Sequence, residues 1–125
     1  MSNLLLTGLG GFFGAMGRHG LGGLSQRLVG SPLFPFGTLL VNVLGCLAIG
    51  ALAGVAESRG AFTAERQAFL LTGLLGGFTT WSAFGFESVQ LLRTGHAGLA
   101  AGNVVLQLAV GFAAVFAGLA LGRHI

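Results

Sequence analysis

Four long apolar segments, separated by short connections, most constrain how this chain can fold. They are predicted at residues 4–24, 36–56, 68–92 and 97–121. Each could cross a bilayer as one helix, which takes about 20 apolar residues. Charged side chains make up only 7% of the sequence, against about 25% in soluble domains, so a bilayer is the expected solvent. The sequence therefore predicts a single domain, an all-α membrane protein with four transmembrane helices.

The arginines do not define an orientation in the membrane. With four spans, the N-terminus, the second loop and the C-terminus share one side. The two sides carry three arginines each: Arg59, Arg66 and Arg123 on the first, and Arg27, Arg93 and an outward-extending Arg18 on the second. Orientation normally follows an excess of Arg and Lys on the cytoplasmic side. The balance predicts insertion in both directions and antiparallel pairing of two copies; the alternative is a weak bias hidden by imprecise span ends.

The third predicted span contains the stretch GGFTTWSAFGFE, residues 76–87, in which polar residues interrupt the apolar sequence. Gly76 and Gly77, followed by Thr79 and Thr80, have low helix propensity. If the helix opens there, its freed carbonyls could coordinate a cation, as unwound segments do in transporters. The alternative is a glycine packing notch whose threonines bond preceding carbonyls. The residues themselves favour neither interpretation.

Aromatic rings recur through the same stretch, at Phe78, Trp81 and Phe84. This three-residue spacing predicts that the rings share one side of a helix. The edge of an aromatic ring is electropositive, so ring edges that face a narrow passage would favour a small anion. Aromatic stripes at helical spacing more often pack a core, and the stripe alone favours that simpler interpretation.

Amide and carboxyl side chains lie inside the predicted spans. Asn42 follows Thr38 by one turn in the second span, and Asn103 and Gln107 lie one turn apart in the fourth. An amide could replace part of an ion's hydration shell, or it could hydrogen-bond a neighbouring helix. Glu87 could accept a hydrogen bond from Thr38, face a hydrated vestibule, or extend towards the interface. An ionisable residue at such a depth is a candidate functional residue.

Three segments together resemble the CrcB/Fluc family of fluoride channels: GGFFGAMGRH in the first span, PFGTLLVNVLG over residues 35–45, and GGFTTWSAFGFE in the third span. The resemblance covers essentially the whole chain. It implies a multi-pass protein of the cell inner or plasma membrane that works as an antiparallel, dual-topology homodimer with two fluoride pathways. It also implies passive export of fluoride, which relieves fluoride toxicity in the cytoplasm.

The resemblance further implies particular site residues. A structural sodium ion is expected at the dimer centre, held by the main-chain carbonyls of Gly76 and Thr79. The family's pore asparagine matches Asn42, and its two pore aromatics match Trp81 and Phe84. The remaining pathway positions are polar: Ser82, Thr38 and Glu87, with Gln107 as a looser match.

Two positions depart from the family pattern. Trp81 stands where the family usually has phenylalanine, and its indole is larger and adds an N–H donor. Ala83 stands where the family usually has a hydroxyl residue, which removes one donor from the polar track. These departures bear on conduction rate and selectivity.

Two other functions fit a small membrane protein. The first is a proton- or sodium-coupled exporter that uses Glu87 as its coupling carboxylate. The second is a membrane subunit without transport activity. This hypothesis does not explain Asn42 or the hydroxyl groups of the third span. The sequence has no Ser/His/Asp or Cys/His spacing typical of catalysis, so we interpret the protein as a non-enzyme. Its scattered arginines do not indicate nucleic-acid binding.

Overall fold

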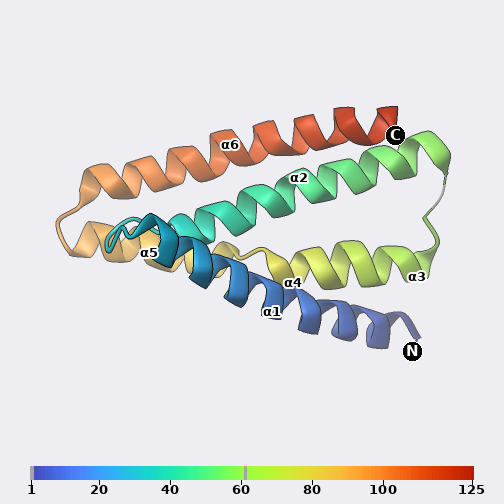
Figure 1. Cartoon of the computed structure of the whole chain (residues 1–125), viewed down its shortest axis with the longest axis horizontal. Helices are drawn as coiled ribbons and strands as arrows, with labels where there is room; N and C mark the ends of the chain where they lie inside the picture. The colour runs from blue at the N-terminus through green and yellow to red at the C-terminus, as the bar shows by residue number, and fades with distance from the viewer. Residues whose placement is uncertain (1, 61) are drawn as a thin grey trace.

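The computed structural model describes residues 2–60 and 62–125, which form helices joined by short connections. The helical segments are α1 (Ser2–Val29), α2 (Phe36–Arg59), α3 (Ala64–Arg66), the π-helical segment η1 (Gln67–Leu75), α4 (Gly76–Phe78), α5 (Trp81–Arg93) and α6 (Ala97–His124). They run along one common axis, with the start of α1 and the end of α6 at the same end of the molecule (Figure 1). Three of the predicted spans lie within single helices, and the third, residues 68–92, covers η1, α4 and α5 with two non-helical residues between them.

Among the residues that the structure describes, three stretches are long and apolar enough to cross a membrane, judged by length and composition: Phe36–Arg59, Ala64–Arg93 and Ala97–His124. The helix α1 is also long, but it contains Arg18, His19 and several glycines, which contribute little hydropathy. The prediction of an all-α protein with several membrane-spanning helices is therefore confirmed. The fourth span, through α1, stays a prediction.

Glycines bring the helix backbones into close contact. The helix α2 packs along α6, and α1 packs along η1 and α4. A methyl group added to Gly118 would overlap the Leu47 carbonyl oxygen of α2, and one added to Gly14 would overlap the Leu74 carbonyl oxygen of η1. The sequence contains five pairs of glycines spaced four residues apart. Four of these pairs face a neighbouring helix in this way: Gly10/Gly14, Gly73/Gly77, Gly50/Gly54 and Gly118/Gly122. Around Gly98 and Gly102, an added methyl meets nothing within 4 Å.

The connection between α2 and α3 is shorter than the gap between the second and third predicted spans. The helix α2 continues to Arg59, three residues past the predicted end of the second span, and α3 begins at Ala64. Gly60 ends α2 in the left-handed region, at φ 59°, where its N–H bonds the Ala56 carbonyl at 3.0 Å. Thr63 caps α3, with its Oγ1 accepting the Arg66 N–H at 3.4 Å.

The stretch that contains the third predicted span is not a regular α-helix. Its first part, η1, has the wider π-helical turn, which the sequence analysis did not anticipate. Gly76 and Gly77 remain helical in α4, and Gly77 lies against the backbone of Gly11. The chain then becomes extended at Thr79 and Thr80, with ψ angles of 162° and 114°. The β-branched threonines favour this conformation, and α5 begins directly after them.

Candidate functional site

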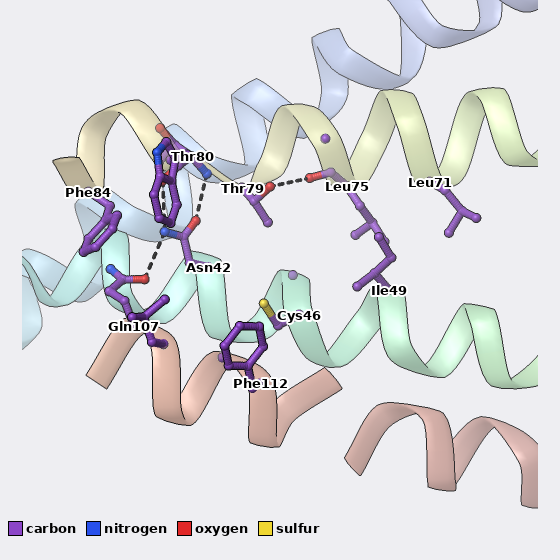
Figure 2. Close-up of a pocket in the computed structure, with 15 residues that line it drawn as sticks. Asn42, Cys46, Ile49, Leu71, Leu75, Thr79, Thr80, Phe84, Gln107 and Phe112 are labelled. Carbon is purple, nitrogen blue, oxygen red and sulfur yellow. Dashed lines mark hydrogen bonds between the residues drawn. The ribbon is translucent and has the colours of Figure 1, made fainter. Parts of the chain in front are cut away.

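Asn42 of α2 completes the extended connection between α4 and α5. The Thr80 N–H donates to Asn42 Oδ1 at 2.7 Å, and Asn42 Nδ2 donates to the Thr80 carbonyl at 3.0 Å. Figure 2 shows the Asn42 side chain facing the Thr80 backbone. Backbone groups freed by a helix interruption are costly in hydrocarbon unless the protein satisfies them. The Asn42 amide does so for both groups of Thr80 and thereby stabilises the interruption.

The main-chain carbonyls of residues 76–79 lose their usual helical donors at this interruption, and those of Gly76 and Thr79 concern the sodium prediction. In a continuous α-helix, the N–H of residue 80 would bond the carbonyl of residue 76, and that of residue 83 the carbonyl of residue 79. Here the Thr80 N–H donates to Asn42 instead, and the Ala83 N–H donates to Thr80 Oγ1 at 3.1 Å. The carbonyls of Gly76 and Thr79 are therefore released from the α-helical pattern. These are the two carbonyls that the sequence analysis assigned to sodium.

Gln107 of α6 presents a hydrogen-bond donor next to Asn42. Asn42 Nδ2 donates to Gln107 Oε1 at 3.1 Å, and this bond fixes which end of the Gln107 amide faces away. Gln107 Nε2 is buried and has no hydrogen-bond partner among the residues that the structure describes. A buried donor without a partner is rare in proteins. It is suited to a ligand that accepts hydrogen bonds.

A groove of about 370 Å³ lies between the interruption, α2 and α6. Asn42, Thr80, Phe84 and Gln107 gather near one end of it, and Ile49 and Leu71 lie towards the other (Figure 2). The remaining lining is mostly small or apolar, and Gly76 and Thr79 also belong to it. The groove therefore combines a few polar groups with a largely apolar wall.

The aromatic rings do not form the predicted stripe of three. Trp81 and Phe84 are neighbours in α5, with ring centroids 4.9 Å apart in an edge-on arrangement. Phe78 lies in α4, before the interruption, where its ring is close to Gly17 and Gly45. The prediction that Phe78 shares their side of one helix is wrong, because the extended threonines break the helical periodicity between them. Phe84 is 6% exposed, whereas Trp81 is 74% exposed.

A second cavity, of about 650 Å³, lies on α1, α2 and α5. Thr38 and Glu87 line it, and Thr38 Oγ1 donates to Glu87 Oε1 at 2.7 Å, the bond that the sequence analysis considered. The other carboxylate oxygen of Glu87 is buried without a described partner. Arg18 lines the same cavity and supplies positive charge. Thr80 lines both this cavity and the groove, so the interruption lies between the two.

Ser82 and Ala83 lie at the start of α5. The hydroxyl oxygens of Ser82 and Thr80 are 3.3 Å apart. Ala83 lines the second cavity, and its N–H is taken by Thr80. Ser82 thus lies beside the interruption but outside the linings of both cavities. The other candidate site residues line one of them: Asn42, Gly76, Thr79, Trp81, Phe84 and Gln107 the groove, and Thr38 and Glu87 the second cavity.

Sequence reasoning missed two features of the site. It treated Thr80 only as part of a helix-breaking pair, whereas Thr80 connects Asn42, Ser82 and the start of α5. It also did not single out Ser88, whose Oγ accepts a hydrogen bond from Asn103 Nδ2 at 3.0 Å. The spacing of Ser88 one turn after Phe84 was a usable signal, because it places both residues on one helix face.

The fold and site together define a class of protein. They describe a small all-helical membrane protein with a helix interruption, an unpaired amide donor and two cavities that are both lined by Thr80. Residues 5–119 match the model of a family described as CrcB-like protein, Camphor Resistance (CrcB). The chain belongs to this family.

Three similar proteins share the name fluoride-specific ion channel FluC. The relative from Agrobacterium fabrum is 46% identical over 125 residues, which is 100% of this chain and 99% of the relative. The relative from Nitratidesulfovibrio vulgaris is 45% identical over 126 residues, covering 98% of both chains. The relative from Methylobacillus flagellatus is 43% identical over 121 residues, covering 97% of this chain and 94% of the relative.

Proposed function

We propose that the protein is a fluoride-selective ion channel that mediates passive fluoride export across the plasma membrane. In this proposal α1 is the fourth membrane span, and two copies assemble as an antiparallel, dual-topology homodimer. The names and full-length similarity of the relatives support it. The observation that carries it is the unpaired, buried Nε2 donor of Gln107, which lines the same groove as Phe84 and Trp81.

The donors around the groove suit fluoride. Fluoride is small, strongly hydrated and a good hydrogen-bond acceptor, so removing its water is costly unless other donors replace it. The hydrogen bonds from Asn42 Nδ2 to Thr80 and Gln107 account for both of its hydrogens. Asn42 thus orients the free donor of Gln107 and holds the interruption in place. The ring edges of Trp81 and Phe84 add positive potential.

The path continues past Thr80 to the second cavity. The hydroxyls of Thr80 and Ser82 lie at the junction, and Thr38 and Glu87 line the cavity beyond it. Hydroxyl groups rotate to donate or accept as a passing ion requires. The Arg18 side chain in the same cavity attracts anions and offsets the charge of Glu87. We assign the polar track to these residues.

A sodium ion fits the carbonyls that the interruption releases. Carbonyl oxygens are suitable ligands for a hard cation, and unwound helix segments supply them in transporters. The carbonyls of Gly76 and Thr79 have lost their helical donors, and both residues line the groove. We propose that these carbonyls hold sodium at the dimer centre, where its charge raises the local positive potential.

The groove is also the proposed contact with the second copy. Trp81 is 74% exposed and Phe112 is 64% exposed at its rim, and both are large and apolar. A second copy inserted in the opposite direction would cover these rings and enclose the donor of Gln107. The balanced arginines of the two sides support this antiparallel arrangement.

Fluoride efflux from proteoliposomes tests the proposed function. Vesicles loaded with potassium fluoride are treated with valinomycin, and release is followed with a fluoride electrode beside a chloride-loaded set. We expect rapid fluoride release and no comparable chloride release. Well-folded dimeric protein that releases no fluoride would contradict the proposal.

Replacing Phe84 by isoleucine is expected to slow fluoride flux about tenfold. The change keeps an apolar side chain but removes the ring edge and its contact with Trp81. Aromatic pairs contribute about 0.5–1.5 kcal/mol beyond burial, and about 1.4 kcal/mol corresponds to a tenfold rate. Initial efflux rates at matched protein density measure the effect. Phe86→Ile is the control, because Phe86 is 65% exposed on the same helix. Equal efflux rates for the wild type and Phe84→Ile would show that the Phe84 ring is not part of the pathway.

A coupled exporter is the second candidate, favoured by the half-buried carboxylate of Glu87 in the larger cavity. Coupling through Glu87 requires flux driven by a proton or sodium gradient, and Glu87→Gln would abolish that flux. For the channel, we expect Glu87→Gln to retain voltage-driven fluoride release at a reduced rate, because the glutamine oxygen still accepts the Thr38 hydroxyl. Release with and without an imposed ion gradient at zero voltage distinguishes the two functions.

A further inference from the structure

Asn103 and Ser88 form a buried polar contact that the proposed pathway does not use. Asn103 of α6 is 0% exposed and Ser88 of α5 is 8% exposed. Asn103 Nδ2 donates to Ser88 Oγ at 3.0 Å, and Ser88 Oγ donates to the Phe84 carbonyl at 2.8 Å. Among the described residues, this is the one side-chain hydrogen bond that joins α5 to α6. It ends at the backbone of an aromatic residue that lines the groove.

The contact relates Phe84 to the amides of the site. Asn103 and Gln107 lie one turn apart in α6, so they project from similar sides of the helix. Gln107 is bonded to Asn42 of α2, and Asn103 is bonded to Ser88 of α5. The helix α6 therefore holds both walls of the groove through two neighbouring amides. The position of the Phe84 ring relative to the Gln107 donor depends on both bonds.

Stability alone does not account for an asparagine at this position. Asn103 Oδ1 is buried and has no described hydrogen-bond partner. An unpaired buried acceptor destabilises a fold, and an apolar group of the same shape would avoid that cost. Leucine has the same branching and number of side-chain heavy atoms as asparagine. A leucine here would remove the unpaired oxygen and leave Ser88 bonded to Phe84.

We propose that Asn103 is a positioning residue for anion selectivity, acting through Ser88 to fix the Phe84 ring beside the Gln107 donor. This inference rests on the proposed channel function. A narrow passage replaces the water of fluoride only if its donors and ring edges are held close together. Loss of the Asn103 bond lets α5 shift or rotate, which moves the ring and widens the passage for larger anions.

The variant Asn103→Leu tests the proposal in the full-length dimer. We expect its thermal midpoint to equal or exceed that of the wild type, its fluoride flux to fall about tenfold, and its fluoride-to-chloride ratio to fall by a similar factor. Trp81 is the single tryptophan of the chain and contacts Phe84. Its fluorescence emission should therefore shift in this variant, which reports ring displacement independently of transport.

Two further variants make the result decisive. Ser88→Ala breaks the same connection from α5 and should change selectivity and Trp81 emission in the same direction. Leu91→Ala is the control, because Leu91 lies on the same buried face of α5 but is not bonded to Asn103; it should lower stability without changing the anion ratio.

Unchanged selectivity and unchanged Trp81 emission in Asn103→Leu would overturn the inference. Loss of folding in both Asn103→Leu and Ser88→Ala would also overturn it, because the hydrogen-bonded pair would then be needed for the stability of the whole helix bundle. Absence of fluoride flux in the wild type would instead overturn the proposed function.

Discussion

The Asn42→Asp variant is expected to lose fluoride flux almost completely while it still assembles as a dimer. Aspartate retains an acceptor for the Thr80 N–H but loses the donors to the Thr80 carbonyl and to Gln107. It also places a negative charge beside the proposed path. Two like charges about 4 Å apart repel by about 4 kcal/mol at an effective dielectric constant of 20. With about 1.4 kcal/mol for each factor of ten, we expect a loss of at least about 100-fold.

Proteoliposome efflux measures the loss of fluoride flux, and size-exclusion chromatography measures whether the variant still assembles as a dimer. Asn3→Asp is a matched control, because it introduces the same charge at an exposed residue of α1, far along the sequence from the interruption. It should conduct as the wild type does. Wild-type flux in Asn42→Asp would exclude Asn42 from the pathway, and a monomeric or aggregated product would show that its bonds to Thr80 are needed for folding.

Gly118→Ala is expected to destabilise the protein strongly. An added methyl would overlap the Leu47 carbonyl oxygen and press on the backbone at Ala51, so α2 and α6 would have to separate. Backbone atoms cannot adjust as a flexible side chain does, and overpacking of a close contact typically costs about 1–3 kcal/mol. The gain of up to about 1 kcal/mol in helix propensity from glycine to alanine does not offset this. Thermal unfolding in detergent should show a clearly lower midpoint.

Gly102→Ala supplies the comparison on the same helix. Its added methyl meets nothing within 4 Å of the single chain, so the propensity gain should leave the midpoint equal or slightly higher. Equal midpoints for the two alanine variants would show that the α2–α6 contact is looser than the structure indicates. A large loss in Gly102→Ala alone would place that glycine in the contact between copies.

Much of the candidate site was predictable from residue types. Asn42, Glu87 and the glycine–threonine run are unusual in apolar segments, and a resemblance carried by short motifs assigned them to a common site. The fluoride pathway and the sodium ligands stay predictions. The ring pattern was read incorrectly at Phe78, because a helical spacing was extended across residues that are not helical. The π-helical segment was not predictable, since residues 67–75 are mostly apolar and equally compatible with an α-helix.

The sequence by itself determined the class of fold and the solvent. Long apolar segments with very few charges can satisfy their backbones in a bilayer only as helices or closed barrels, and their length matches helices. Only the tertiary structure decided how the polar groups are used. In the folded chain, both hydrogens of the Asn42 amide are used in hydrogen bonds, Gln107 Nε2 has no described partner, and Asn103 is bonded to Ser88. Hydrogen bonds between residues far apart in sequence depend on the packing of several helices at once. No local pattern contains that information.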